Sequence, residues 1–168
     1  MRFAPALLGL AALVSATAAS AQTLEPIAYS PAFQSELEDD LGTREGEYLS
    51  ENVTRAIEQA LARRNVAAAP IRIEVVIEDA QPNRFTIHQL RSRPGVDAMR
   101  SVSVGGAELR AVLRDSNGAV LTEVEHRRYT NSLRDLFTEP LTWTDANRTI
   151  RQFAEKVADA YVAHTSAR

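Results

Sequence analysis

The sequence contains no cysteine. Such a chain forms no disulfides and offers neither thiolate ligands for a metal nor a cysteine nucleophile, so its folded state must rely on a hydrophobic core. Lysine is almost absent too, because Lys156 is the only lysine among 19 basic residues. The formal net charge of −3 argues against nucleic-acid binding, for which a basic excess is expected.

Apolar runs long enough to span a membrane are also missing, and the only candidate is short and lies at the start of the chain. Arg2 precedes an apolar segment at residues 4–14, and Ala19-Ser20-Ala21 fits the small-x-small rule for signal cleavage. These features predict a signal peptide over residues 1–21, cleaved near Ala21, and no stable membrane span after cleavage. No cysteine follows the apolar segment, which excludes a bacterial lipid anchor. We expect a periplasmic location, with secretion further out as the alternative.

Motifs that carry catalysis or bind cofactors are absent as well. The three histidines, His88, His126 and His164, are isolated and 38 residues apart, so they do not form a zinc motif. The sequence has neither a Gly-x-Ser-x-Gly elbow nor a phosphate-binding loop. We therefore predict no catalytic residue, no metal site and no cofactor, and we favour a non-enzymatic protein.

Helical periodicity marks three segments. Ser30 and Pro31 are suited to the N-cap and first position of a short helix that ends near Gly42. A longer apolar stripe runs from Leu49 to Leu61, and Asn65 is suited to the position after the helix end. A third stripe predicts a terminal helix from residue 142 or 144 onward, and Trp143 is expected to anchor its start to the core.

Period-two alternation marks the strands. Residues 71–78 predict a strand with one buried face, residues 27–29 and 85–87 predict short strands, and residues 79–83 predict a turn. A long hairpin is predicted over residues 99–129, with its turn at Asp115-Ser116-Asn117-Gly118. Within it, the apolar residues change from even to odd positions at Gly105-Gly106. A strand cannot change parity unless it absorbs an extra residue, so we predict a structural bulge or sharp bend at Gly105 and Gly106.

These elements predict one domain over residues 22–168 in the α+β class. Helices with one apolar stripe must bury it, and the half-apolar face of a sheet is the available partner. We expect a two-layer domain with a mainly antiparallel sheet of three to four strands and two main amphipathic helices packed on one face. The pattern does not fix the strand order or the oligomeric state.

Charge is unevenly distributed along the chain, with a surplus of acids over residues 36–51 and arginines gathered over residues 84–100. Segregated charge can guide docking, although solvated loops also carry charge for solubility. The predicted interaction surface consists of Glu36, Glu38, Asp39, Asp40, Arg91, Arg93 and Arg100.

Two stretches, Asp40-Leu-Gly-Thr-Arg-Glu-Gly-Glu-Tyr-Leu49 and Arg100-Ser-Val-Ser-Val-Gly-Gly-Ala107 with the strand that follows, are similar to a group of uncharacterised exported proteobacterial proteins, grouped as a domain of unknown function. The resemblance implies no activity and no catalytic residue. The sequence therefore favours a periplasmic binding or interaction module of the cell envelope, with another envelope protein as its partner. A small envelope-associated hydrolase and a small-molecule or lipid carrier with a cavity between sheet and helices are the alternatives.

Overall fold

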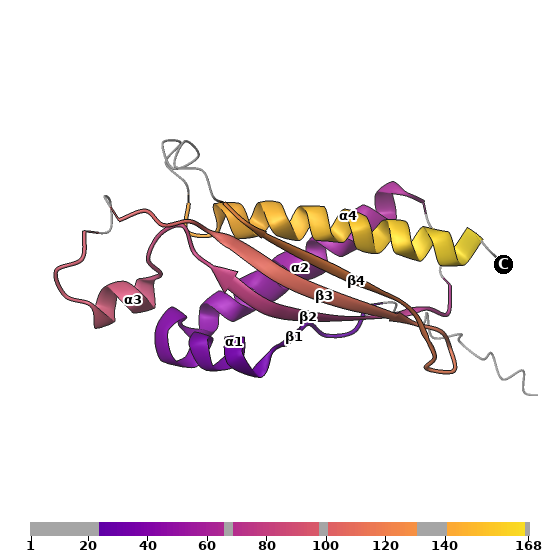
Figure 1. Cartoon of the computed structure of the whole chain (residues 1–168), viewed down its shortest axis with the longest axis horizontal. Helices are drawn as coiled ribbons and strands as arrows, with labels where there is room; N and C mark the ends of the chain where they lie inside the picture. The colour runs from indigo at the N-terminus through magenta and orange to yellow at the C-terminus, as the bar shows by residue number, and fades with distance from the viewer. Residues whose placement is uncertain (1–23, 66–68, 98–100, 131–140, 167–168) are drawn as a thin grey trace, which may run out of the picture.

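The computed structural model describes residues 24–65, 69–97, 101–130 and 141–166. The described strands form one sheet in the order β1-β2-β3-β4, in which β1 runs parallel to β2 and the other neighbours are antiparallel. The predicted α+β class with a mainly antiparallel sheet is confirmed (Figure 1). The elements in chain order are β1 (Ala28–Tyr29), α1 (Pro31–Glu36), the π-helical turn η1 (Leu37–Leu41), α2 (Thr43–Arg63), β2 (Arg72–Gln81), α3 (Ile87–Ser92), β3 (Gly106–Arg114), β4 (Val120–Tyr129) and α4 (Thr144–Ser166).

The turn between β3 and β4 follows from local sequence. The Asp115 side chain accepts hydrogen bonds from the N–H groups of Asn117 and Ala119, at 2.8 and 2.9 Å. Gly118 has a φ of +85°, a conformation that glycine adopts at low cost. This turn sets the β3–β4 register, in which Leu109 lies opposite His126.

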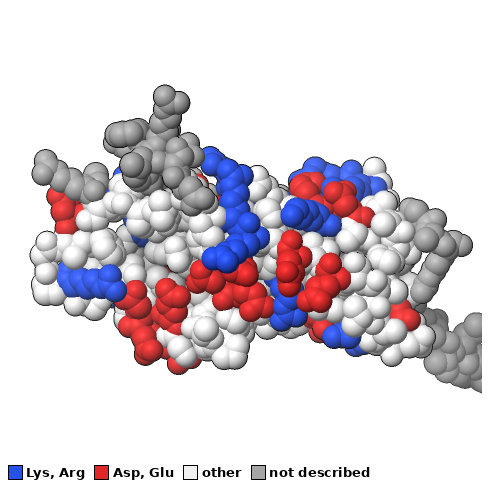
Figure 2. Space-filling model, in the orientation of Figure 1, with Lys and Arg blue, Asp and Glu red and all other residues white. Residues whose placement is uncertain are grey.

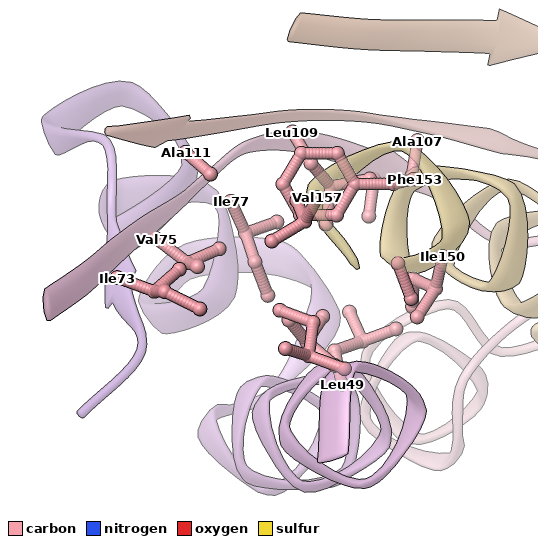
Figure 3. Packing of buried hydrophobic residues seen from close by; sticks show 14 of the residues in the cluster. Leu49, Ile73, Val75, Ile77, Ala107, Leu109, Ala111, Ile150, Phe153 and Val157 are labelled. Atoms are coloured by element: carbon pink, nitrogen blue, oxygen red, sulfur yellow. The ribbon is translucent and has the colours of Figure 1, made fainter. Parts of the chain in front are cut away.

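The core lies between the sheet and the pair α2 and α4, which cover the same sheet face (Figure 3). Side chains from each element point into this space, including Leu49 of α2, Ile77 of β2, Leu109 of β3 and Phe153 of α4, all at most 1% exposed. Trp143 is also buried at the start of α4, as predicted. Truncating a side chain in such a position to alanine typically costs about 2–5 kcal/mol.

The opposite sheet face is charged rather than apolar. Arg110 contacts Glu78 at 2.9 Å, and Arg114 contacts Glu74 at 2.9 Å, so ion pairs connect β2 to β3. Acidic and basic side chains consequently lie next to one another across this face (Figure 2).

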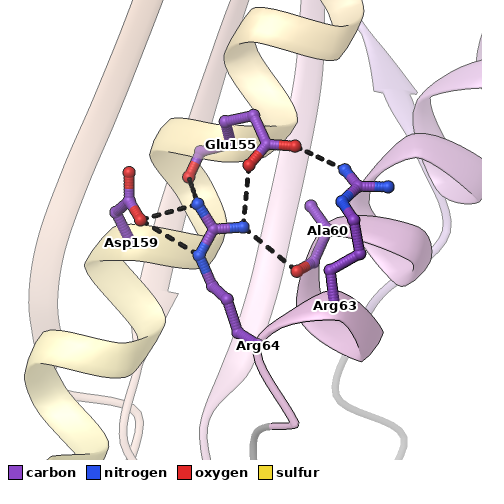
Figure 4. Close-up of polar contacts among 5 residues, drawn as sticks. All are labelled: Ala60, Arg63, Arg64, Glu155 and Asp159. Atoms are coloured by element: carbon purple, nitrogen blue, oxygen red, sulfur yellow. Dashed lines mark hydrogen bonds and ion pairs between the residues drawn. The ribbon is translucent and has the colours of Figure 1, made fainter.

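Two arginines at the end of α2, chiefly Arg64, join this helix to α4 (Figure 4). Arg64 donates to Asp159 at 2.6 and 3.0 Å and contacts Glu155 at 2.8 Å. It also donates to two backbone oxygens, those of Ala60 and Glu155. Arg63 also forms an ion pair with Glu155. Both arginines lower the pKa of Glu155 below its usual value, and the hydrogen bond from Arg63 has the larger effect.

One predicted strand is wrong. Residues 87–92 form the helix α3 instead of a strand beginning at Phe85 and Ile87. The cause is a capping box, because the Thr86 hydroxyl accepts from the Gln89 N–H while the Gln89 side chain accepts from the Thr86 N–H. Both residues are buried, and this reciprocal pairing outweighs the weak strand preference of the neighbouring residues.

The predicted hairpin also begins too early, and the bulge lies elsewhere. Strand β3 begins at Gly106, so Gly105 and Gly106 stand at the start of a strand instead of inside one. In the β2–β3 ladder the register shift lies between Ile77 and Asp79. Strand β2 also extends into the expected turn at residues 79–83, because it ends only at Gln81.

Close packing, and not a bulge, explains why glycine occupies positions 105 and 106. A Cβ on Gly106 would collide with the Arg128 carbonyl oxygen and lie 2.7 Å from the Tyr129 Cα, both on the paired strand. A Cβ on Gly105 would lie 2.5 Å from the side-chain oxygen of Asn83. Glycine is required here because neighbouring chain segments approach the backbone closely.

Candidate functional site

An open groove of about 560 Å³ lies beside α3. This volume is in the range of small-ligand sites. Helix α3 lies at the end of the molecule opposite the β3–β4 turn (Figure 1). The groove lies where α1, the end of β2, α3 and the segment before β3 meet. Its lining residues are Glu36, Gln81, Pro82, Arg84, Phe85, Gln89, Ser101, Val102, Ser103 and Val104.

One wall of the groove is the segment 101–104, which is fixed by Asn83. The Ser103 N–H donates to the Asn83 carbonyl at 2.9 Å, and the Asn83 side chain donates to the Ser103 carbonyl at 3.3 Å. Arg84 and Val102 form an isolated antiparallel bridge beside them. These bonds hold an otherwise irregular segment in a defined position against the end of β2.

The other wall is α3, which is anchored to η1. The Thr86 hydroxyl donates to the Leu41 carbonyl at 2.7 Å, and Gln89 donates to the Asp40 carboxylate at 2.6 Å. Arg93 forms an ion pair with Asp40, and its guanidinium lies 5.6 Å from the centre of the Phe85 ring. A helix of six residues has little stability alone, so these contacts hold it in place.

Glu36 places a carboxylate in the groove. Its pKa is raised, first because the side chain is partly buried and then because Asp79 and Asp40 lie nearby. None of the described residues donates a hydrogen bond to this carboxylate. The groove therefore holds a negative charge that is partly desolvated and not compensated by a contact within the described chain.

The remaining lining is partly apolar. Phe85 comes from the turn before α3, and Val102 and Val104 come from the opposite wall. Val104 is 42% exposed, and among the described valines only Val120 is also exposed. The groove thus combines an apolar surface with two charged residues, Glu36 and Arg84.

A second depression adjoins the groove at Gln81 and includes Asp79 and Tyr129. The Tyr129 hydroxyl donates to the Asp79 carboxylate. Burial first, and then this hydrogen bond, raise the pKa of Tyr129. A tyrosine with a raised pKa keeps its proton at neutral pH, so Tyr129 is a poor candidate for a general base.

The ring of His126 forms no hydrogen bond with a carboxylate among the described residues. Its ring nitrogens contact Gln152 at 3.2 Å and Lys156 at 3.0 Å, both on α4. Because the lysine ammonium can only donate, Nδ1 is the acceptor and Nε2 carries the proton that is donated to Gln152. Burial chiefly lowers the pKa of His126, and the charges of Lys156 and Arg128 add to this effect. His126 therefore acts as a neutral link between β4 and α4.

The predicted interaction surface is only partly brought together. Glu36 lines the groove, and Asp40 pairs with Arg93 within the chain, so part of the expected charge segregation is neutralised internally. Glu38 accepts a hydrogen bond from Gln34 on the exposed side of the helix, and Asp39 and Arg91 are exposed. Arg100 lies outside the described residues.

Several groove residues were not predicted from the sequence. Gln89 carries a detectable signal, because Thr86-x-x-Gln89 is a capping-box pattern. The sequence pattern predicts Phe85 in a strand and Val102 in the hairpin. Val104 has no local feature that distinguishes it from a core residue, since its position depends on the bonds made by Asn83 and Ser103.

Within the described ranges, no group of three or more histidine, aspartate or glutamate side chains is arranged to hold a metal ion. No helix in these ranges is both long and apolar enough to cross a membrane.

Comparisons with known proteins give little more. No protein-family model and no curated protein matches the chain. Among solved structures, the crystal structure of a putative lipoprotein from Caulobacter crescentus aligns with 71% of this chain and 85% of its own, at 15% identity and a TM-score of 0.39. A likeness of this size assigns neither a family nor an activity to the chain.

Proposed function

We propose that the protein is an exported, non-enzymatic binding module of the cell envelope, and that it binds another envelope protein through the groove at α3. The bound segment carries a lysine or arginine beside apolar side chains. The cationic group reaches the Glu36 carboxylate, and the apolar part lies on Phe85, Val102 and Val104.

The observation that supports this proposal is the state of Glu36. This carboxylate is partly buried, lies near Asp79 and Asp40, and has no donor among the described residues, so its charged form is destabilised and its pKa is raised. A ligand cation at hydrogen-bond distance would relieve this, and the nearby Asp79 carboxylate would add attraction. A carboxylate that is costly in the free protein and compensated in a complex is typical of a binding site.

The location rests on the first 21 residues. Their basic start, apolar segment and small-x-small cleavage site predict export, and a partner in the envelope follows from that location.

The two alternatives gain no support from the described residues. A carrier needs space between sheet and helices, and there the core side chains of α2, α4 and the strands are packed together. A histidine-dependent hydrolase needs a correctly placed acid or base, and His126 contacts Gln152 and Lys156 instead.

The proposal can be tested without knowing the partner. Random peptides displayed on phage are selected for binding to the mature protein, and the selected peptides are then titrated by calorimetry against the wild type, Glu36→Gln and Glu47→Gln. Glu47 is an exposed carboxylate on α2 and serves as the matched control.

We expect the selected peptides to share a lysine or arginine next to apolar residues. They should bind Glu36→Gln about 10-fold to 100-fold more weakly, since a hydrogen bond to a charged group contributes about 1.5–3 kcal/mol. Binding to Glu47→Gln should be unchanged. Selected peptides without basic residues, or equal affinity for both variants and the wild type, would overturn the proposal.

A further inference from the structure

Strand β4 is the last strand of the sheet (Figure 1), and among the described residues β3 is the only strand that pairs with it. The strand is ten residues long and contains no proline. Its register shift lies at the hairpin end, between Leu113 and Arg114 of β3, so its ladder from Thr122 onward is regular. Long regular edges can pair with another strand unless charges or bulges prevent it.

The backbone groups of this edge alternate in direction. The Thr130 N–H donates to the Gly105 carbonyl, which extends the same register by one pair. In an antiparallel ladder every second residue of an edge strand bonds its neighbour. The even-numbered residues of β4 therefore bond β3, and the backbone groups of Glu123, Glu125 and Arg127 face outward.

The charges along the edge are separated by sign. Glu123 and Glu125 lie in the first part of the strand, and Arg127 and Arg128 lie in the last part. The side chains of Glu123, Glu125 and Arg127 lie on the charged face of the sheet, because each of these residues is paired with a β3 residue whose side chain points away from the core. An antiparallel copy of the same strand would set acidic residues against basic ones, whereas a parallel copy in register would set like charges together.

We infer that β4 pairs antiparallel with β4 of a second copy of this chain, so that two sheets join into one across a twofold axis at His126. In this register Glu125 of each copy faces Arg127 of the other, and Glu123 faces Tyr129. The interface is self-complementary, as twofold symmetry requires.

The charge pairs between neighbouring strands within each copy support this register. Arg110 contacts Glu78 on one side and lies opposite Glu125 on the other, and Arg127 contacts Glu108 at 3.3 Å. Joining the two edges would give one row of alternating charge across five strands: Glu78, Arg110 and Glu125 of one copy, then Arg127 and Glu108 of the other. Shifting the twofold axis to Glu125 would instead set two glutamates against each other. The groove at α3 is a separate surface, so this inference stands independently of the proposed function.

Charge reversal gives the first test. In Glu125→Arg, two copies would set arginine against arginine, and in Arg127→Glu they would set glutamate against glutamate. A mixture of the two variants would have only opposite charges facing each other. Sedimentation equilibrium should show a dimer for the wild type, dissociation constants raised about tenfold for each variant alone, and a restored dimer in the equimolar mixture. Circular dichroism establishes that each variant is folded.

The absence of cysteine provides the second test, since any cysteine introduced is unique. In His126→Cys the two introduced sulfurs lie opposite each other at the twofold axis. Val124→Cys is the control, because residue 124 of one copy lies opposite residue 128 of the other and the two introduced sulfurs are therefore apart. Mild oxidation should cross-link His126→Cys far faster than Val124→Cys. A wild type that stays monomeric at the highest attainable concentration, a mixture that fails to restore the dimer, or equal cross-linking at both positions would overturn the inference.

Discussion

The side chain of Asn83 forms a reciprocal pair with Asp145. Its Nδ2 donates to the Asp145 carboxylate at 2.6 Å, and its Oδ1 accepts from the Asp145 backbone N–H at 2.9 Å. Asn83 thereby satisfies one N–H of the first turn of α4, the role that an N-cap residue usually fills from within its own helix. The same side chain donates to Ser103, so one residue joins the end of β2, the groove wall and α4.

Asn83→Ala should therefore destabilise the protein. It removes bonds among buried groups and leaves the Asp145 carboxylate without this donor, which should lower the free energy of unfolding by about 2–4 kcal/mol. Urea unfolding followed by circular dichroism measures this. Asn117→Ala in the exposed β3–β4 turn, which loses no buried bond, should cost less than half as much. Equal losses for the two variants would show that Asn83 does not have this joining role.

The close approach at Gly106 leads to a second prediction. Gly106→Ala must displace the backbone of β4 near Arg128, and backbone cannot rotate away as a flexible side chain can. We expect a loss of about 1–3 kcal/mol in the free energy of unfolding, and a larger loss for Gly106→Val. An unchanged melting temperature for Gly106→Val would contradict the close packing.

Structural features that depend on residues close together in the sequence were predictable, whereas those that depend on distant residues were not. The β3–β4 turn was predictable because Asp115 and Gly118 act within four residues of each other. The cap at Ser30 and the helix end at Asn65, which has a φ of +49°, are equally local and are confirmed. Asn83 acts on Asp145, 62 residues away, and no local pattern indicates that.

The groove was only partly predictable for the same reason. The surplus of acids around Glu36 marks it as a candidate, but this surplus does not indicate that Asp40 is neutralised by Arg93, 53 residues away. The parity change at Gly105-Gly106 was a real pattern with a different cause. Val104 precedes the strand, so its exposure reflects the path of segment 101–104 and not a bulge.

The arginine pair at the end of α2 allows a matched comparison. The Arg64 side chain is 21% exposed and contacts Asp159, Glu155 and two carbonyls, whereas the Arg63 side chain is 57% exposed and pairs with Glu155 alone. Arg64→Ala should lower the free energy of unfolding by about 1 kcal/mol. Arg63→Ala should change it by less than about 0.5 kcal/mol. A larger effect for Arg63→Ala in urea unfolding would contradict this ranking.

Glu36 should lower the stability of the free protein at neutral pH. Its pKa is higher in the folded state than the ordinary 4.5, mainly because of burial. As the pH rises from 4.5 through the folded value, the folded state holds more protons than the unfolded state, so the free energy of unfolding contributed by this group falls. Glu36→Gln should therefore stabilise the protein at pH 7.

The matched measurement compares Glu36→Gln with Glu47→Gln by urea unfolding at pH 7 and at pH 4. The gain from Glu36→Gln should be present at pH 7 and smaller at pH 4, where the wild-type carboxyl is largely protonated. Glu47→Gln should change little at either pH. Together with the loss of peptide binding, this would make Glu36 a residue that lowers stability and supports function. A destabilised Glu36→Gln would show that the carboxylate has a structural role instead.

The most direct test of the binding groove is photo-cross-linking in living cells. A photoreactive amino acid is placed at Val104 in the groove or, as a control, at Val120 at the far end of the sheet, which are 42% and 56% exposed. The account predicts a discrete adduct with an envelope protein from position 104, reduced when Glu36→Gln is added, and no such adduct from position 120. The absence of an adduct from position 104, or an adduct with the same partner protein in equal yield from both positions, would contradict it.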